Sequence, residues 1–353
     1  HVALVAGEAG IGKSSLVRAL ADRAGEAELW WGGCDALETP HPLLPLQDIA
    51  RGADVGFAEL LAAGERARLF EAVLSELQAT RRPKLFVVED AHWADEATLD
   101  LLKFVGRRIA QAPCLLVVTY RDDEVDAAHP LRRLTAQLPA QQSSRFDLPR
   151  LTPAAVAQLA RQAFRAADGI HEITQGNPFF VSELLRNESF DVPRGVQDLV
   201  LSRLSRLSPP AQDIVRLASV VPGRIERWLV EILLSNTPET LEEALDSGLL
   251  VAQGNDLAFR HELARVAVEV SLSPALAPSL HARILSALDR SGAPETSLAR
   301  RVHHAVRAGN AAAVRRLAPE AALLAQKRGA HKEAAAQWRT ALQFMYRTPF
   351  GVA

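Results

Sequence analysis

The apolar residues in the first half of the chain fall into short continuous runs that alternate with amphipathic stretches. In residues 14–24, for example, Leu16, Leu20 and Ala21 share one side of a predicted helix. Continuous apolar strands between helices are typical of a parallel sheet that is covered on both faces. We therefore predict a doubly wound α/β domain over residues 1–150, with strands in the segments HVALVAG, ELWWGGCDA, KLFVVED, CLLVVTYR and RFDLP.

The pattern changes after residue 150, where strands nearly vanish. The segment TPAAVAQLARQAF is typical of a helix with Thr152 as its N-cap and Pro153 in its first position. In GNPFFVSELL a helix breaks and starts again at Pro178. We predict a helical lid over residues 151–191.

The remaining chain is also mainly helical. Two short apolar runs, GLLVAQ and LAFRHE, flank a Gly-Asn-Asp turn, which predicts a hairpin within a winged-helix-like domain over residues 192–272. From Pro274 onward the chain is alanine-rich, and residues 311–344 form one helix-turn-helix pattern with its turn at RGAHKEA. We predict a TPR-like α-helical segment over residues 273–353.

Composition and charge narrow the classes of function. A length of 353 residues predicts about two to four domains, and a net charge of −2 gives no global attraction to nucleic acid or to an anionic membrane. Cys34 and Cys114 lack metal-ligand spacing and are typical of reduced cysteines. With no apolar run of membrane-spanning length and no basic leader or cleavage site, we expect a cytoplasmic protein without a membrane partner. Because the chain opens directly on a strand, we also expect residues upstream of it.

The segment GEAGIGKSS fits the P-loop pattern, with a predicted strand before it and an amphipathic helix after it. Glycines let consecutive backbone N–H groups turn inward around a β-phosphate, and the following helix adds its positive end. We expect Lys13 to reach the β- and γ-phosphates and Ser14 to offer its hydroxyl to Mg²⁺. The predicted nucleotide-binding residues of this loop are Gly7, Glu8, Ala9, Gly10, Ile11, Gly12, Lys13, Ser14 and Ser15.

A P-loop needs acids that hold the metal and activate water, and the strand LFVVED ends in Glu89 and Asp90. Side chains alternate along a strand, so the two acids cannot do the same job. We favour Asp90 as the more important acid and as the metal ligand beside Ser14. The alternative is that this acid pair caps a helix, but Asp95 is already a candidate for that N-cap.

Two further groups near these acids have open roles. His92 and Trp93 are candidates either for direct catalysis or for a packed pair that anchors the loop. At the end of the next strand, Thr119 and Arg121 can face the γ-phosphate and distinguish ATP from ADP. The alternative for Arg121 is a surface pair with Asp122 or Asp123.

With these motifs placed, the sequence resembles the STAND branch of AAA-like P-loop ATPases and, more narrowly, the large ATP-binding regulators of the LuxR family. The matching segments cover nearly the whole chain in the family's order. They are GEAGIGKSSLVRA, CDALETPHPLLPLQDIAR, VVEDAHWADEATLDLLKF, LLVVTYRDDEV, HPLRRL, TQGNPFFVSELL, AFRHELARVAVE and GAHKEAAAQWRTAL.

This resemblance implies a slowly hydrolysing ATPase that acts as a switch. ADP would hold a closed form, and ATP with an inducer, a small molecule or a protein on the helical tail, would permit opening and self-association. Pro178 of GNP would pack near the adenine, and His261 of FRHE would touch the ADP β-phosphate. The alternative for His261 is a histidine satisfied within its own hairpin.

The sequence also departs from the family. Its acid pair is Glu-Asp where many relatives have Asp-Asp, which leaves open how the two acids divide their roles. The adenine-holding segment upstream and the DNA-binding helix-turn-helix downstream are absent from it, so DNA binding is expected only through a further C-terminal domain. Two alternatives remain: the same module regulating another effector enzyme, such as a nucleotide cyclase, or a ring-forming AAA+ ATPase.

Overall fold

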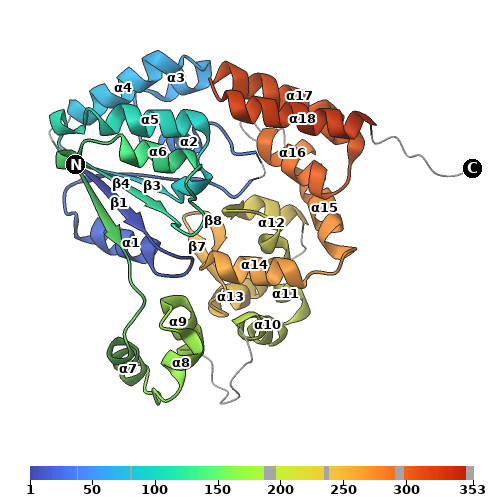
Figure 1. Cartoon of the computed structure of the whole chain (residues 1–353). Coiled ribbons are helices and arrows are strands. Elements are labelled where there is room, and N and C mark those ends of the chain that lie inside the picture. Colours follow the sequence, from blue (N-terminus) through green and yellow to red (C-terminus); the bar gives the residue numbers. More distant parts are fainter. Residues whose placement is uncertain (38, 80–81, 187–195, 234–237, 291–297, 347–353) are drawn as a thin grey trace, which may run out of the picture. The chain divides into compact units, whose positions relative to one another are not determined.

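The computed structural model describes residues 1–37, 39–79, 82–186, 196–233, 238–290 and 298–346. These residues form two compact units, which can be followed along the chain in Figure 1. The first contains His1–Gly7, Lys13–Asp147 and the chain from Leu288 onward, whereas the second contains Glu8–Gly12 and Leu148–Ala287. The division predicted at residue 191 lies outside the described residues.

The first unit is built on a five-stranded parallel sheet. The strand order is β2-β3-β4-β1-β5, so β4 lies between the strand that leads into the P-loop and the strand that ends in the two acids. The predicted parallel-sheet α/β fold is thus confirmed. The strands are β1 (Val2–Ala6), β2 (Glu28–Gly33), β3 (Lys84–Glu89), β4 (Cys114–Tyr120) and β5 (Ser143–Asp147).

Helices cover this sheet and bury an aromatic and aliphatic core. The fully buried Trp30 ring meets Phe57 and Phe86 edge-on, with ring centroids 5.5 and 5.8 Å apart. The helices are α1 (Lys13–Arg23), α2 (Leu44–Gly52), α3 (Ala58–Ala63), α4 (Arg66–Gln78), η1 (Ala91–Trp93), α5 (Glu96–Gly106), η2 (Ile109–Gln111), α6 (Pro130–Ala136) and η3 (Ala140–Gln142).

The apolar side that the sequence predicts for the first helix is not the buried one. Leu16 and Leu20 are 47% and 39% exposed, whereas Val17 is buried together with Lys13. Residues four apart lie on one helix face, so the burial of Lys13 at the helix start turns Val17 inward.

The C-terminal part of the first unit is helical, as predicted. It contains α16 (Leu298–Arg307), α17 (Ala311–Lys327) and α18 (His331–Tyr346), and α15 (Leu276–Arg290) leads into it from the second unit. Gly329, with φ of +73°, turns the chain between α17 and α18, which pack against each other. These two helices are drawn in red in Figure 1.

The second unit combines helices with a small antiparallel sheet of order β6-β8-β7. Gln253 pairs with Asp256, so the predicted hairpin turn consists of Gly254 and Asn255 alone. The strands are β6 (Arg224–Glu226), β7 (Leu250–Gln253) and β8 (Asp256–Phe259), and the helices are α7 (Pro153–Gln162), α8 (Ile170–Thr174), α9 (Pro178–Arg186), α10 (Val196–Ser205), α11 (Pro209–Ser219), α12 (Arg227–Leu233), α13 (Pro238–Asp246) and α14 (Glu262–Ser271).

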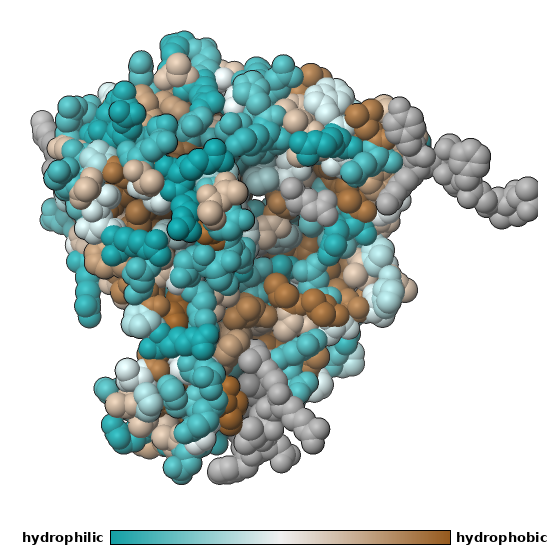
Figure 2. All heavy atoms as spheres, viewed as in Figure 1, coloured by the Kyte–Doolittle hydropathy of each residue, from teal (hydrophilic) through white to brown (hydrophobic). Residues whose placement is uncertain are grey.

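The face drawn in Figure 2 is mainly hydrophilic, with hydrophobic patches between the polar ones. Such scattered apolar surface is normal for a folded protein. Among the described residues, no helix has the length and apolar character needed to cross a membrane.

Candidate nucleotide-binding site

The P-loop connects β1 directly to α1. Gly10 and Gly12 have φ of +78° and +99°, a region that side chains other than glycine rarely adopt. The two glycines differ in surroundings. A Cβ atom on Gly12 would meet nothing within 4 Å, whereas one on Gly10 would lie 2.8 Å from the Cβ atom of Phe179.

Lys13 is nearly buried at the start of α1, with 7% of its surface exposed. Its Nζ donates to the carbonyl oxygen of Gly7 at 2.7 Å, across the base of the loop. Burial lowers the pKa of Lys13, and the nearby Asp90 carboxylate acts in the opposite direction. The ammonium group is therefore held beside the loop that precedes it and within the field of Asp90. Ser14 and Ser15 follow it in the first turn of α1.

The two predicted acids have different surroundings. Glu89 ends β3, and its Oε2 accepts a hydrogen bond from Trp31 Nε1 at 2.9 Å. Its Oε1 is buried and has no hydrogen-bond partner among the described residues. Asp90 has φ of +53°, an uncommon conformation for a residue other than glycine, and its N–H donates to Thr119 Oγ1 at 3.0 Å.

The end of β4 brings Thr119 and Arg121 next to the acid-bearing strand. Thr119 contacts Asp90 through the hydrogen bond described above. Arg121 forms an ion pair with Glu124, rather than with either predicted aspartate, and its guanidinium lies 4.8 Å from the ring of Trp93. Only 12% of the Arg121 side chain is exposed, so this is a packed arginine.

His92 is a buried, neutral histidine. Its ring lies 4.3 Å from that of Trp93, and its Nδ1 accepts the N–H of Arg121 at 3.4 Å. Burial lowers the pKa of His92 to about 3, and the positive charges of Arg121 and Lys13 act in the same direction. This geometry favours the packed pair among the two predicted roles of His92 and Trp93.

The predicted capping role of Asp95 is confirmed. It is the N-cap of α5, and its carboxylate accepts the N–H of Thr98 at 3.0 Å. It also accepts the N–H of Leu43 at 3.0 Å, and burial raises its pKa. Capping of α5 is therefore supplied by Asp95, five residues after Asp90.

The tip of the P-loop, Glu8–Gly12, belongs to the second unit together with the GNP motif. The side-chain amide of Asn177 donates to Glu8 Oε1 at 2.9 Å and to the carbonyl oxygen of Ala9 at 3.0 Å. Pro178 begins α9, and the His261 ring lies 4.4 Å from that of Phe179. The second unit thus brings five residues of the loop together with the segments that carry Pro178 and His261.

Asn177 is the residue that the sequence reasoning missed. The motif was assigned through its proline, but an asparagine directly before a proline at a helix start is also an N-cap pattern. The structure gives it this role, because its Oδ1 accepts the N–H of Phe179 at 3.0 Å. The remaining amide group faces the P-loop.

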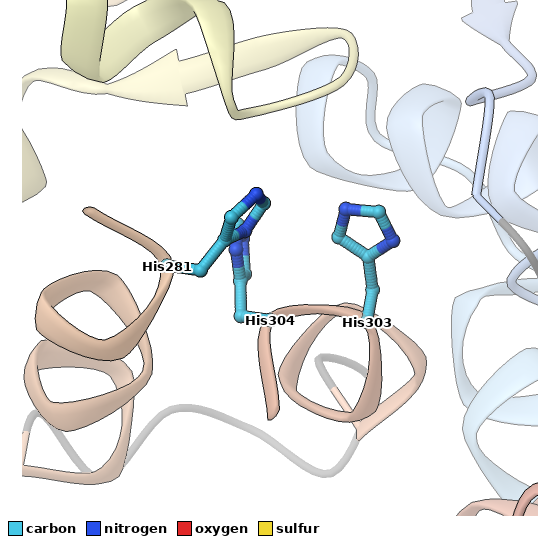
Figure 3. Close-up of side chains that lie close together, drawn as sticks. All are labelled: His281, His303 and His304. Atoms are coloured by element: carbon cyan, nitrogen blue, oxygen red, sulfur yellow. The ribbon is translucent and has the colours of Figure 1, made fainter. Parts of the chain in front are cut away.

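Three histidines in α15 and α16 are drawn in Figure 3: His281, His303 and His304. The rings of His303 and His304 are 5.3 Å apart in the first unit, whereas His281 belongs to the second. We therefore assign them no common metal site.

Comparisons with known proteins agree with the P-loop geometry. Residues 1–118 match the family model of the AAA ATPase domain. An uncharacterized protein of Rhizobium meliloti (strain 1021) is 26% identical over 363 residues, which cover 82% of this chain and 35% of that relative. Residues 1–118 are therefore similar to an AAA ATPase domain, and the chain spans only about a third of the length of this relative.

One solved structure resembles almost the whole chain. It is a Signal Transduction ATPase with Numerous Domains (STAND) protein with a tetratricopeptide repeat sensor from Pyrococcus horikoshii. The TM-score is 0.64 at 18% identity, and the match covers 99% of this chain and 56% of that one. The likeness shows a common fold for a chain that spans just over half of the solved protein.

Proposed function

We propose that this chain is the ATP- and ADP-binding switch module of a LuxR-type transcriptional regulator, with slow hydrolysis. The observation that carries this proposal is the loop from Gly7 to Lys13, which has positive-φ glycines and a nearly buried ammonium at its base. That arrangement suits a polyphosphate, because the loop offers backbone donors and the lysine offers a positive charge.

The two acids supply the chemistry beside the phosphates. We assign Asp90 and Ser14 as the ligands of Mg²⁺, because both offer the hard oxygen atoms that Mg²⁺ prefers. Asp90 is also near enough to the P-loop lysine for its carboxylate to raise the pKa of Lys13. We assign Glu89 as the residue that activates the attacking water. Its Oε2 is fixed by the hydrogen bond from Trp31, which leaves the buried Oε1 to accept a proton from the water. Thr119 and Arg121, at the end of β4, would then contact the γ-phosphate and distinguish ATP from ADP.

The second unit supplies the state-dependent contacts. A ligand shifts a two-state equilibrium only through its different affinity for the two states. In this proposal Pro178 contacts the adenine and His261 the ADP β-phosphate in a closed form, and residues 192–272 act as a winged-helix-like domain. DNA binding would come from a domain outside this chain.

The helical tail is the proposed sensor, with TPR-like character over residues 273–353. Within the first unit its α17–α18 turn is tied to α4 and α5. Arg66 donates to the Gly329 carbonyl at 3.2 Å, and Glu333 Oε1 accepts the N–H of Glu96 at 3.1 Å. Asp95, the N-cap of α5, lies only five residues after Asp90 in the chain. An inducer on the tail would therefore act close to the acids.

Substitution of Lys13 tests the nucleotide site. Lys13→Ala should weaken ATP and ADP binding by about 100-fold, since one charge-assisted contact to phosphate contributes roughly 2–3 kcal/mol. Isothermal titration calorimetry measures the affinity, and Lys327→Ala, which removes an exposed lysine of α17, is the matched control. Unchanged affinity in Lys13→Ala would refute the P-loop assignment.

The mass of the protein with each nucleotide tests the switch. We expect a smaller species with ADP and self-association with ATP, measured by light scattering. A stable hexamer in both states would instead support the ring-forming ATPase. Purification followed by nucleotide analysis would show whether ADP is retained.

A further inference from the structure

The Asn177 side chain sits where the helix α9 meets the tip of the P-loop. It is 4% exposed, and both ends of its amide are used. Its Oδ1 accepts the N–H of Phe179, while its Nδ2 faces two acceptors, Glu8 Oε1 and the carbonyl oxygen of Ala9. This pattern fixes the orientation of the amide, because only a nitrogen can face two acceptors and only an oxygen can face an N–H.

The contact with Ala9 bears on the phosphate-binding surface. The C=O and N–H groups of a trans peptide point in opposite directions. When Asn177 holds the Ala9 carbonyl, the N–H of Gly10 therefore points away from α9. Inward-facing N–H groups of this kind form the anion-binding concavity of a P-loop.

Other contacts hold the loop tip in the same place. The N–H of Phe179 also donates to the carbonyl oxygen of Gly10 at 3.2 Å, and Arg150 pairs with Glu8 Oε2 at 2.6 Å. Gly10 is packed so closely that an added Cβ atom would lie 3.0 Å from Asn177 Oδ1. The tip is thus held by α9 through both backbone and side-chain hydrogen bonds.

We propose that Asn177 is a positioning residue of the nucleotide site, which orients the Ala9–Gly10 peptide so that the Gly10 N–H faces the β-phosphate. This inference rests on the proposed nucleotide binding. It assigns to the asparagine a role toward phosphate that is separate from the role proposed for Pro178 toward adenine.

The test is Asn177→Asp, which keeps the helix cap but replaces the amide donor with a carboxylate that repels Glu8 and the Ala9 carbonyl. We expect ADP affinity to fall by roughly 10-fold to 100-fold, in line with the loss of one hydrogen bond near a charge. At saturating ADP, the ³¹P resonance of the bound β-phosphate should move while that of the α-phosphate stays.

The matched control is Asn310→Asp in the tail, where an asparagine also caps a helix, through the N–H of Ala313 at 3.0 Å. It should bind ADP as the wild type does. If Asn177→Asp does not fold by circular dichroism, Asn177→Ser, which also keeps a capping residue and lacks the amide donor, takes its place.

The two levels of the proposal fail in different ways. A wild-type protein that binds no ADP would refute the proposed function. Wild-type ADP binding with unchanged affinity and an unmoved β-phosphate resonance in the folded Asn177 variant would overturn the positioning role alone.

Discussion

The two ends of the parallel sheet each hold a buried lysine, but the two lysines have different surroundings. At the amino end, Lys84 is 3% exposed, donates to Glu28 Oε2 at 2.5 Å and lies 4.5 Å from the Trp30 ring. Glu28 also accepts a hydrogen bond from Trp30 Nε1, and the hydrogen bond from Lys84 lowers the pKa of Glu28. Here a buried charge is paired with a carboxylate of the fold itself.

At the carboxyl end, several charged groups lie close together around the P-loop. Lys13 donates to a backbone carbonyl, Glu89 keeps a buried oxygen without a partner among the described residues, and Asp90 has a strained backbone. His92 is held neutral beside them. The difference teaches that buried charge alone does not mark a site, whereas converging charge with unused hydrogen-bonding capacity does.

The largest effect is expected from Glu89→Gln, which removes the proposed base and keeps the shape of the side chain. ATP turnover should fall by about 100-fold or more, because general base catalysis contributes on that order, while ATP affinity stays near that of the wild type. Steady-state phosphate release measures it. Glu28→Gln at the opposite end is the control, and equal turnover in the two variants would remove Glu89 from the mechanism.

An intermediate effect is expected from Lys84→Met, which removes the charge and keeps an apolar stem. The unfolding free energy should fall by about 1–2 kcal/mol, a value reduced from that of a fully buried pair because 38% of the Glu28 side chain is exposed. Urea denaturation measures the loss. ADP affinity should not change, and a parallel loss of affinity in the folded variant would break the contrast between the two ends.

The smallest effect concerns pH and His92. Its folded pKa of about 3 lies below the ordinary value of 6.5, so the unfolded chain takes up the proton first. This contribution to stability is complete above pH 6.5 and is lost as pH falls toward 3, at up to about 1.4 kcal/mol per pH unit. In His92→Gln the fall in unfolding free energy between pH 6.5 and pH 5 should be shallower than in the wild type.

Urea titrations at the two pH values provide this measurement. The exposed His331→Gln is a control that should keep the wild-type slope. An identical slope in His92→Gln would show that the buried ring does not set the acid sensitivity.

Local patterns in the sequence predicted much of the fold. The strand segments, the helical tail, the hairpin and the N-cap Asp95 follow from residues close together in the chain, because strand patterns, caps and turns are short-range features. The predicted apolar side of α1 was wrong, since the burial of Lys13 by its surroundings in the fold outweighed the pattern of leucines.

The candidate site likewise has parts that the sequence predicted and parts that it did not. The P-loop and the acids were visible in the sequence because their chemistry requires particular residues at particular spacings. Arg121 pairs with Glu124, whereas the alternative interpretation of the sequence named Asp122 or Asp123, and the sequence did not indicate the role of Asn177, because hydrogen-bond partners depend on where segments meet in space.

The sequence by itself determined which residues could hold a phosphate and which segments would form strands and helices, since both depend on local composition and spacing. Only the tertiary structure decided that β4 lies between β1 and β3, that Trp31 fixes one oxygen of Glu89 and that Asn177 holds the Ala9 carbonyl. The two hydrogen bonds join residues 58 and 168 positions apart in the chain, and such pairings are set by the packing of whole elements.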